Sequence, residues 1–251
     1  MNVKIKMPKF GRDQTGRGWL KELLMTTLGT TISIVLTFGT SAWLDQRQQA
    51  KNRRQTAMMV LSNIEDFARN MRYVDSTLVA WDSTLTRIVA LPRDSVLRLN
   101  QDEADAFLEA VIGGGVLLQR DKTAENIFTN DISTWRDVGN LRFISNVGEC
   151  YSFINDIEKN YRIQCDRKYE LRERFIEEYD YEKMAGAECV AAILDMKGAK
   201  LFIDDFTRGF VPYFESSIDD LLWFNSENMR LIGVTREEVT DFIRAGEQTT
   251  E

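Results

Sequence analysis

Two pairs of adjacent carboxylates lie in the most aromatic part of the chain. They are Asp204-Asp205 and Asp219-Asp220, and the aromatic residues around them are Phe202, Phe206, Phe210, Tyr213, Phe214, Trp223 and Phe224. One protonated and one ionised carboxylate beside aromatic rings is the arrangement that a glycosidase uses. Neighbouring residues of a helix point about 100° apart, so neither pair can act on one bond by itself. An Asp of each pair could meet its counterpart only across a helical hairpin that turns at residues 209–212. Catalysis is therefore the minor interpretation, and solvent-facing acids on helices with an aromatic core are favoured.

The other residue types that commonly carry chemistry are scarce. The chain contains no His, which removes the commonest general base, the commonest metal ligand and the standard Ser-His-Asp triad. Cys150, Cys165 and Cys189 match no metal-binding spacing. On one helix Cys150 and Cys165 would lie about 22 Å apart, too far for a disulfide, whereas a bridge from Cys189 to either stays open. Free or buried thiols are favoured, and no calcium loop with alternating acids is present. We predict no enzymatic activity, no cofactor and no metal ion.

Composition predicts an all-α fold and limits the partners. Only three Pro and 15 Gly occur in 251 residues, no Gly stands between Gly39 and Gly113, and no Pro stands between Pro8 and Pro92. The formal charge is −7, and because residues 1–22 carry net +4, the remainder carries −11. An acidic body argues against nucleic acid as a partner, whereas a basic tail before an apolar segment suits anionic lipid headgroups.

One apolar segment has the length of a membrane span. Residues 23–44 carry no charge, and these 22 residues would cover about 33 Å as a helix, which matches a hydrocarbon core of about 30 Å. Trp19 and Trp43 bracket the segment and would lie about 36 Å apart, at the two interfaces where indole rings prefer to lie. We predict a transmembrane helix over 19–44. A cleaved signal peptide is disfavoured because the apolar stretch is long and the helical pattern continues through the weak cleavage site at Thr40 and Ala42.

Small side chains recur every fourth residue within the predicted span. They are Gly29, Ser33, Thr37 and Ser41. Such a face lets another transmembrane helix approach closely and form hydrogen bonds across the contact. In the alternative, the hydroxyl groups bond back to the carbonyls of their own helix. The sequence leaves both interpretations open.

Charges on the two sides of the span predict its orientation. Six Lys or Arg residues precede the span, and four follow it closely: Arg47, Lys51, Arg53 and Arg54. By the positive-inside rule, the N-terminus is cytoplasmic and the C-terminal domain lies outside. We therefore predict that most of the chain lies on the outer side of the membrane.

Apolar residues after the span follow a helical seam with alternating spacings of four and three. They are Val60, Ile64, Phe67, Met71, Val74, Leu78, Trp81, Leu85 and Ile88. Pro92 should end this helix near residue 91. The seam would pack either in a coiled-coil dimer or against later helices of the same chain. The flanking positions lack the Glu/Lys pairs that set partner choice in zippers, which favours a bundle within one chain.

Shorter patterns predict the remaining helices. A helix is expected over 101–112 with acids in its first turn, ended by the glycine turn at 113–115. Further helices are expected over about 122–138 and 145–181, and Gly186 and Gly198 punctuate the next helical stretch. A capping box at 235–238 opens a last short helix.

These elements give four parts. Residues 1–18 form a basic tail, 19–44 the transmembrane helix, 45–246 a helical bundle domain with a long first helix over about 45–91, and 247–251 a frayed tail.

Two segments carry a family resemblance. The first is Ala42-Trp43-Leu44-Asp45-Gln46-Arg47, where a Trp ends the span and a polar helix follows. The second comprises Thr123-Ala124-Glu125-Asn126-Ile127, then Ile144-Ser145-Asn146 and Tyr161. The chain resembles a family of single-span, mostly helical envelope proteins of Bacteroidota over about a third of its length, although Ala42 and Leu44 stand where that family tends to place Asn. The resemblance implies architecture and location only, and together with the charge bias the implied location is a bacterial inner membrane, with the N-terminus cytoplasmic and the C-terminal domain periplasmic.

The sequence therefore favours a membrane-anchored, non-enzymatic envelope protein that acts through protein contacts as a scaffold or assembly component. Its expected partners are the lipid bilayer and another membrane or envelope protein, or a second copy of itself. The alternatives are a ligand-sensing bundle coupled to the transmembrane helix and, behind it, a carboxylate-dependent hydrolase.

Overall fold

The computed structural model describes residues 16–130 and 139–247, with side chains described for 47–130 and 139–245. Every regular element in these ranges is helical, so the all-α prediction is confirmed. The chain divides into two units, residues 1–53 and 54–251. Each unit is described by itself.

Helix α1 (Gly16–Val89) is one helix of 74 residues that begins in the first unit. Trp19, Trp43 and the small-residue stripe of Gly29, Ser33, Thr37 and Ser41 belong to the residues whose side chains lie outside the described ones. Within the part of the chain that the structure describes, no helix is both long enough and apolar enough to cross a membrane. The span over 19–44 remains a prediction.

In the second unit, α1 ends where the proline signal places its end. The helix stops at Val89, and the N–H of Leu91 donates to the carbonyl of Ile88 in the following turn. Pro92 has extended backbone and precedes the short helix α2 (Arg93–Val96). The restricted backbone before a proline explains this stop.

Helices α3 (Gln101–Ile112) and α4 (Thr123–Asn130) flank an irregular segment over 113–122. The bounds of α3 match the prediction. Asn100 and Glu103 form a capping box, in which the Asn100 side chain accepts from the Glu103 N–H at 2.9 Å. Helix α4 starts one residue later than expected, and residues 131–138 of the predicted helix lie outside the described residues.

Helix α6 (Leu141–Glu178) begins four residues before the predicted start and ends three residues before the predicted end. Asn140 causes the early start, because its side-chain oxygen accepts from the Phe143 N–H at 3.1 Å and so caps the helix. A 3₁₀ turn, η1 (Tyr181–Lys183), follows.

Helices α7 (Gly186–Asp195) and α8 (Ala199–Asp205) lead into a π-helical turn, η2 (Phe206–Phe210), and then α9 (Val211–Ile232). The hairpin at residues 209–212 that a joint carboxylate site would require is absent. Asp205, Phe206 and Val211 all keep right-handed helical backbone, and the Val211 N–H donates to the Phe206 carbonyl five residues back. A wide turn of this kind accommodates a proline without breaking the helix, here Pro212 in the first turn of α9.

Helix α10 (Arg236–Glu247) completes the described chain. Gly233 ends α9 with a left-handed backbone (φ 66°), a conformation that glycine adopts without strain. The predicted capping box is present, since the Glu238 N–H donates to Thr235 Oγ1 at 3.3 Å and the Thr235 N–H to Glu238 Oε2 at 2.9 Å.

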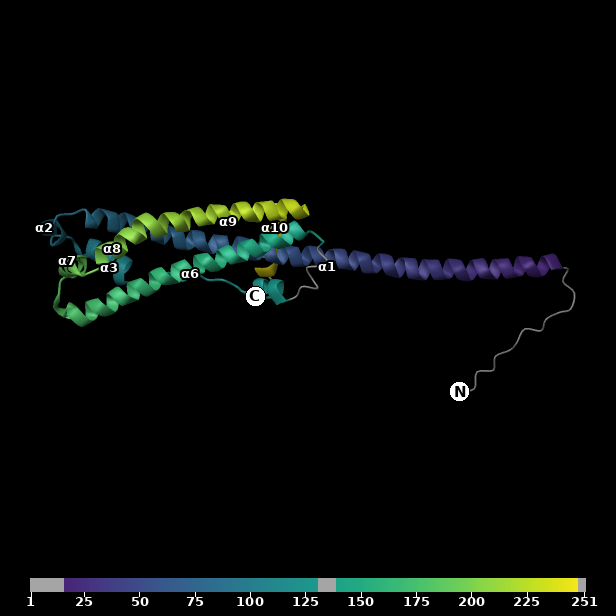
Figure 1. Cartoon of the computed structure of the whole chain (residues 1–251), viewed down its shortest axis with the longest axis horizontal. Helices are drawn as coiled ribbons and strands as arrows, with labels where there is room; N and C mark the ends of the chain where they lie inside the picture. The colour runs from purple at the N-terminus through teal and green to yellow at the C-terminus, as the bar shows by residue number, and fades with distance from the viewer. Residues whose placement is uncertain (1–15, 131–138, 248–251) are drawn as a thin grey trace, which may run out of the picture. The chain divides into compact units, whose positions relative to one another are not determined.

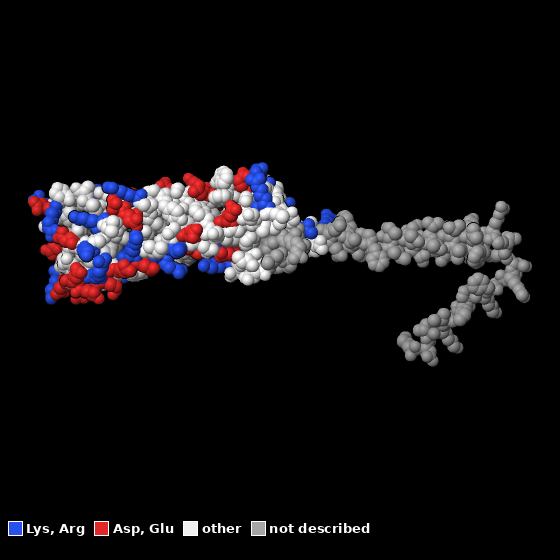
Figure 2. Space-filling view, viewed as in Figure 1, with Lys and Arg blue, Asp and Glu red and all other residues white. Residues whose placement is uncertain are grey.

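The second unit is a helical bundle (Figure 1). Helices α6 and α9 run lengthwise, α2, α3, α7 and α8 gather at one end, and α10 lies near the other. All nine seam side chains of α1 are at most 9% exposed, and they share one hydrophobic cluster with residues of α3 and α6–α10. The cover of this seam therefore comes from the same chain. On the visible face of this unit, Lys and Arg are interspersed with Asp and Glu (Figure 2).

Candidate functional site

The structure separates the two carboxylate pairs. Asp204 of α8 pairs with Arg208 of the adjoining turn η2 (3.0 Å), and Asp205 forms an ion pair with Arg167 of α6. Asp219 and Asp220 are exposed on α9, about 15 residues further along the same helical path and hence about 22 Å away. The two pairs are therefore too far apart for an Asp of one pair and an Asp of the other to act on the same substrate bond.

The three cysteines are free thiols. Cys150 and Cys189 are buried, and Cys165 is partly exposed. Burial raises the pKa of the Cys150 thiol to about 12, although the Asn228 amide donates to its sulfur at 3.5 Å. Such a thiol is inert as a nucleophile at neutral pH. Among the described residues, no cluster of His, Cys, Asp or Glu could hold a metal ion.

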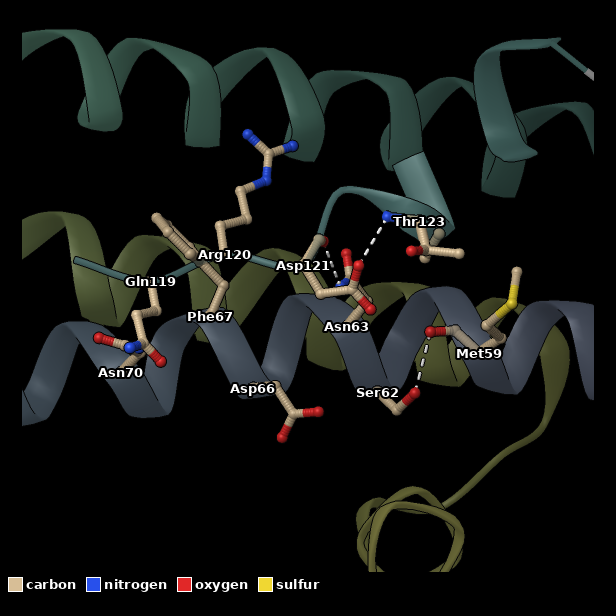
Figure 3. A pocket seen from close by; sticks show the side chains of 11 residues that line it. Met59, Ser62, Asn63, Asp66, Phe67, Asn70, Gln119, Arg120, Asp121 and Thr123 are labelled. Carbon is tan, nitrogen blue, oxygen red and sulfur yellow. Dashed lines mark hydrogen bonds between the residues drawn. The ribbon is translucent and has the colours of Figure 1, made fainter. Parts of the chain in front are cut away.

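A polar groove runs beside α1, with a volume of about 740 Å³. One wall is α1 and the other is residues 119–124 (Figure 3). Its polar side chains include Ser62, Asn63, Asp66, Asn70, Gln119 and Asp121. Asn63 connects the two walls, because its amide donates to the Asp121 carbonyl at 2.9 Å while its oxygen accepts from the Tyr151 hydroxyl at 3.3 Å.

Arg120 is a buried cation behind this groove. Its side chain is 2% exposed, and it forms ion pairs with Glu125 of α4 and, at 2.9 Å, with Glu158 of α6. The guanidinium carbon lies 5.9 Å from the Phe67 ring centre and 5.7 Å from that of Tyr151. Two carboxylates and two rings thus replace the water that the cation loses on burial. Its Nε has no acceptor among the described residues.

Lys168 of α6 is a second buried cation and is 4% exposed. Its Nζ lies 3.7 Å from the Trp81 ring centre on α1 and donates to the Glu109 carbonyl, in the last turn of α3, at 3.0 Å. Burial lowers the pKa of this ammonium to about 8, and the charge of Glu109 opposes the shift. The side chain thereby joins three helices through one cation.

Sequence reasoning missed both cations. Lys168 falls in the four-three pattern of α6 between Tyr161 and Leu171, so this spacing could have predicted that it is buried. Arg120 lies in an irregular segment, where no periodicity exists to place it.

Comparisons with known proteins identify no relative. No family model, no curated protein and no solved structure matches this chain significantly. The resemblance to an envelope family of Bacteroidota therefore stays a prediction.

Removing the Arg120 cation should destabilise the protein strongly. Arg120→Met takes from Glu125 and Glu158, which are only 14% and 20% exposed, the guanidinium that both pair with, and we expect a loss of about 3 kcal/mol in the free energy of unfolding. Urea unfolding of the full chain in a nonionic detergent measures this change in the free energy of unfolding.

The matched controls separate burial from charge. Arg208→Met removes an exposed pair and should change stability by less than about 0.5 kcal/mol. Replacing Arg120, Glu125 and Glu158 together by Met should recover most of the loss. Equal losses from Arg120→Met and Arg208→Met would contradict the buried cluster.

Lys168 should make stability rise with pH. The folded pKa of about 8 lies below the unfolded value of 10.5, so the unfolded chain binds more protons between these values and the folded state gains stability as pH increases. Relative to Lys168→Met, the wild-type free energy of unfolding should rise by about 2 to 3 kcal/mol from pH 7 to pH 10.

Comparison with the Met variant cancels the titration of groups that both proteins share. Lys183→Met, at a lysine side chain that is 81% exposed, is the control. If Lys168→Met and Lys183→Met changed the pH dependence of the free energy of unfolding by the same amount, the role of burial would be contradicted.

Proposed function

We propose that this protein is a membrane-anchored, non-enzymatic component of the bacterial cell envelope that acts through protein–protein contacts, as a scaffold or assembly component. Residues 19–44 of α1 would span the inner membrane, with the N-terminus cytoplasmic and the bundle periplasmic. The observation that carries the proposal is that α1 contains both the predicted span and the buried seam of the bundle. An anchor and a folded domain would then share one helix.

The visible face of the second unit supports contacts with proteins rather than with nucleic acid. This face mixes both signs of charge (Figure 2), whereas phosphate binding needs a basic face. Large apolar side chains are exposed at Tyr73 (70%), Leu201 (73%) and Trp223 (59%). Tyr and Trp are enriched at protein interfaces because one side chain offers both apolar area and a hydrogen bond. A second copy of the chain or another envelope protein fits this surface.

One observation favours a second candidate, a ligand-sensing bundle. Six of the residues that line the polar groove belong to α1. A ligand in the groove would contact the helix that contains the predicted span. Nothing comparable favours a hydrolase, because the carboxylate pairs are separate.

Photocrosslinking in intact cells tests the proposal. A photoreactive phenylalanine analogue at Tyr73, Leu201 or Trp223 should give a recurrent crosslinked product in the washed membrane fraction, because these side chains are exposed. The same analogue at Met71, which is fully buried, is the matched control and should crosslink only within the chain.

Orientation is checked on the same protein. A reporter that is active only in the cytoplasm, fused after residue 251, should stay silent. Recovery of the protein in the soluble fraction, or no recurrent product from any of the three exposed positions, would contradict the proposal.

A further inference from the structure

Helix α10 is attached to the bundle by few buried side chains. Among residues 236–245, whose side chains the structure describes, only Val239 and Ile243 are buried. Helix α7, by comparison, has ten residues and buries five of them. A helix of 12 residues such as α10 is marginally stable by itself in water, so its stability depends on its contacts with the rest of the bundle.

Two ion pairs join α10 to α1. Arg236 pairs with Glu65 at 3.0 Å, and Glu238 pairs with Arg54. Three of these four side chains are about half exposed, and Glu65 is the exception. Ion pairs of such exposure contribute little stability, and salt screens them. The contacts between α10 and α1 are therefore sensitive to ionic strength.

The same ion pairs show which part of α1 lies beneath α10. Arg54, Met58, Leu61 and Glu65 follow one another at spacings of four, three and four, which places them on one side of α1. The outer two pair with α10, and the inner two are almost completely buried. Helix α9 covers this side as well, because the Asn225 amide donates to the Leu61 carbonyl at 3.1 Å. Met58 and Leu61 therefore owe part of their cover to α10.

Helix α10 also has its own cap and a short connection to α9. Both hydrogen bonds of the cap lie between Thr235 and Glu238. The Val234 N–H donates to the Met229 carbonyl at 3.0 Å, and the Val234 side chain is buried, so the chain up to this residue belongs to the end of α9. A backbone rotation between Val234 and Thr235 would therefore move α10 without breaking its cap or the end of α9.

We propose that α10 is a strap that opens and closes over the first turns of α1 in the bundle while the other helices stay folded. Opening breaks both ion pairs, withdraws Val239 and Ile243 from the core and uncovers Met58 and Leu61 beside Arg54. High ionic strength favours the open form, because screening weakens both pairs. The proposal concerns the second unit alone and holds whether or not α1 spans a membrane; only the use of the uncovered face by a partner rests on the proposed function.

Hydrogen–deuterium exchange of the full chain in a nonionic detergent tests the proposal. The amides of residues 239–245 need only local opening, so their protection should be at least about 100-fold lower than that of residues 60–88. Ile88→Val removes one methylene from the fully buried seam, far along α1 from Glu65. It should speed up exchange of residues 60–88 by about two- to tenfold and leave residues 239–245 unchanged within about 1.5-fold.

Two variants of α10 form a matched pair. Arg236→Gln removes a pair with α1 and should speed up exchange of residues 239–245 about threefold. Arg244→Gln removes the same charge from the same helix, but its partner Asp241 also belongs to α10, so the effect should stay below about twofold. Added NaCl should speed up this exchange more in the wild type than in Arg236→Gln.

Three results would overturn the strap. They are equal protection of residues 239–245 and 60–88, acceleration of both segments by the same factor in Ile88→Val, and equal effects of Arg236→Gln and Arg244→Gln. Unchanged helicity of each variant shows that it is folded. None of these outcomes bears on the membrane location, which the crosslinking and reporter experiments test separately.

Discussion

The bundle depends on the burial of one face of α1. Nine side chains from Val60 to Ile88 are almost completely removed from water, and the residues that cover them come from α3 and from α6 to α10. Burial of a large aliphatic or aromatic side chain contributes about 1.5 to 3 kcal/mol, so this seam is a dominant favourable term of the fold. The later helices need α1 for the same reason, since it supplies the apolar face on which they pack.

Two buried cations add specificity to this packing. Hydrophobic contacts between helices tolerate small shifts, whereas a cation with one set of partners does not. Lys168 joins Trp81 on α1 to the end of α3, and Arg120 joins the irregular segment to α4 and α6. Both cations thereby fix the register of helices that apolar packing alone would leave less defined. The segment over 113–122 has no regular hydrogen-bond ladder, so its contacts through Arg120, Asn63 and the Tyr161 hydroxyl determine its position.

Most of the helices could be predicted from the sequence because their causes are local. The four-three pattern of α1, the stop before Pro92 and the Thr235 capping box depend on residues a few positions apart, and each appears where expected. The start of α6 was missed because Asn140 caps it before the apolar pattern begins. Gly209 and Pro212 left a hairpin open as an alternative because both residues signal a break, whereas a π-helical turn continues the helix there. The groove and the Arg120 cluster combine residues up to about 90 positions apart, from Phe67 to Glu158, and no local pattern specifies such contacts.

Hydrogen–deuterium exchange of the full chain in detergent, measured over a hundredfold dilution, tests the central claim most directly. If the chain covers its own seam, the amides of residues 60–88 should exchange only through global unfolding, at a rate that does not change with protein concentration. Protection of this segment that falls as the protein is diluted would show that a partner covers the seam, and would contradict the account.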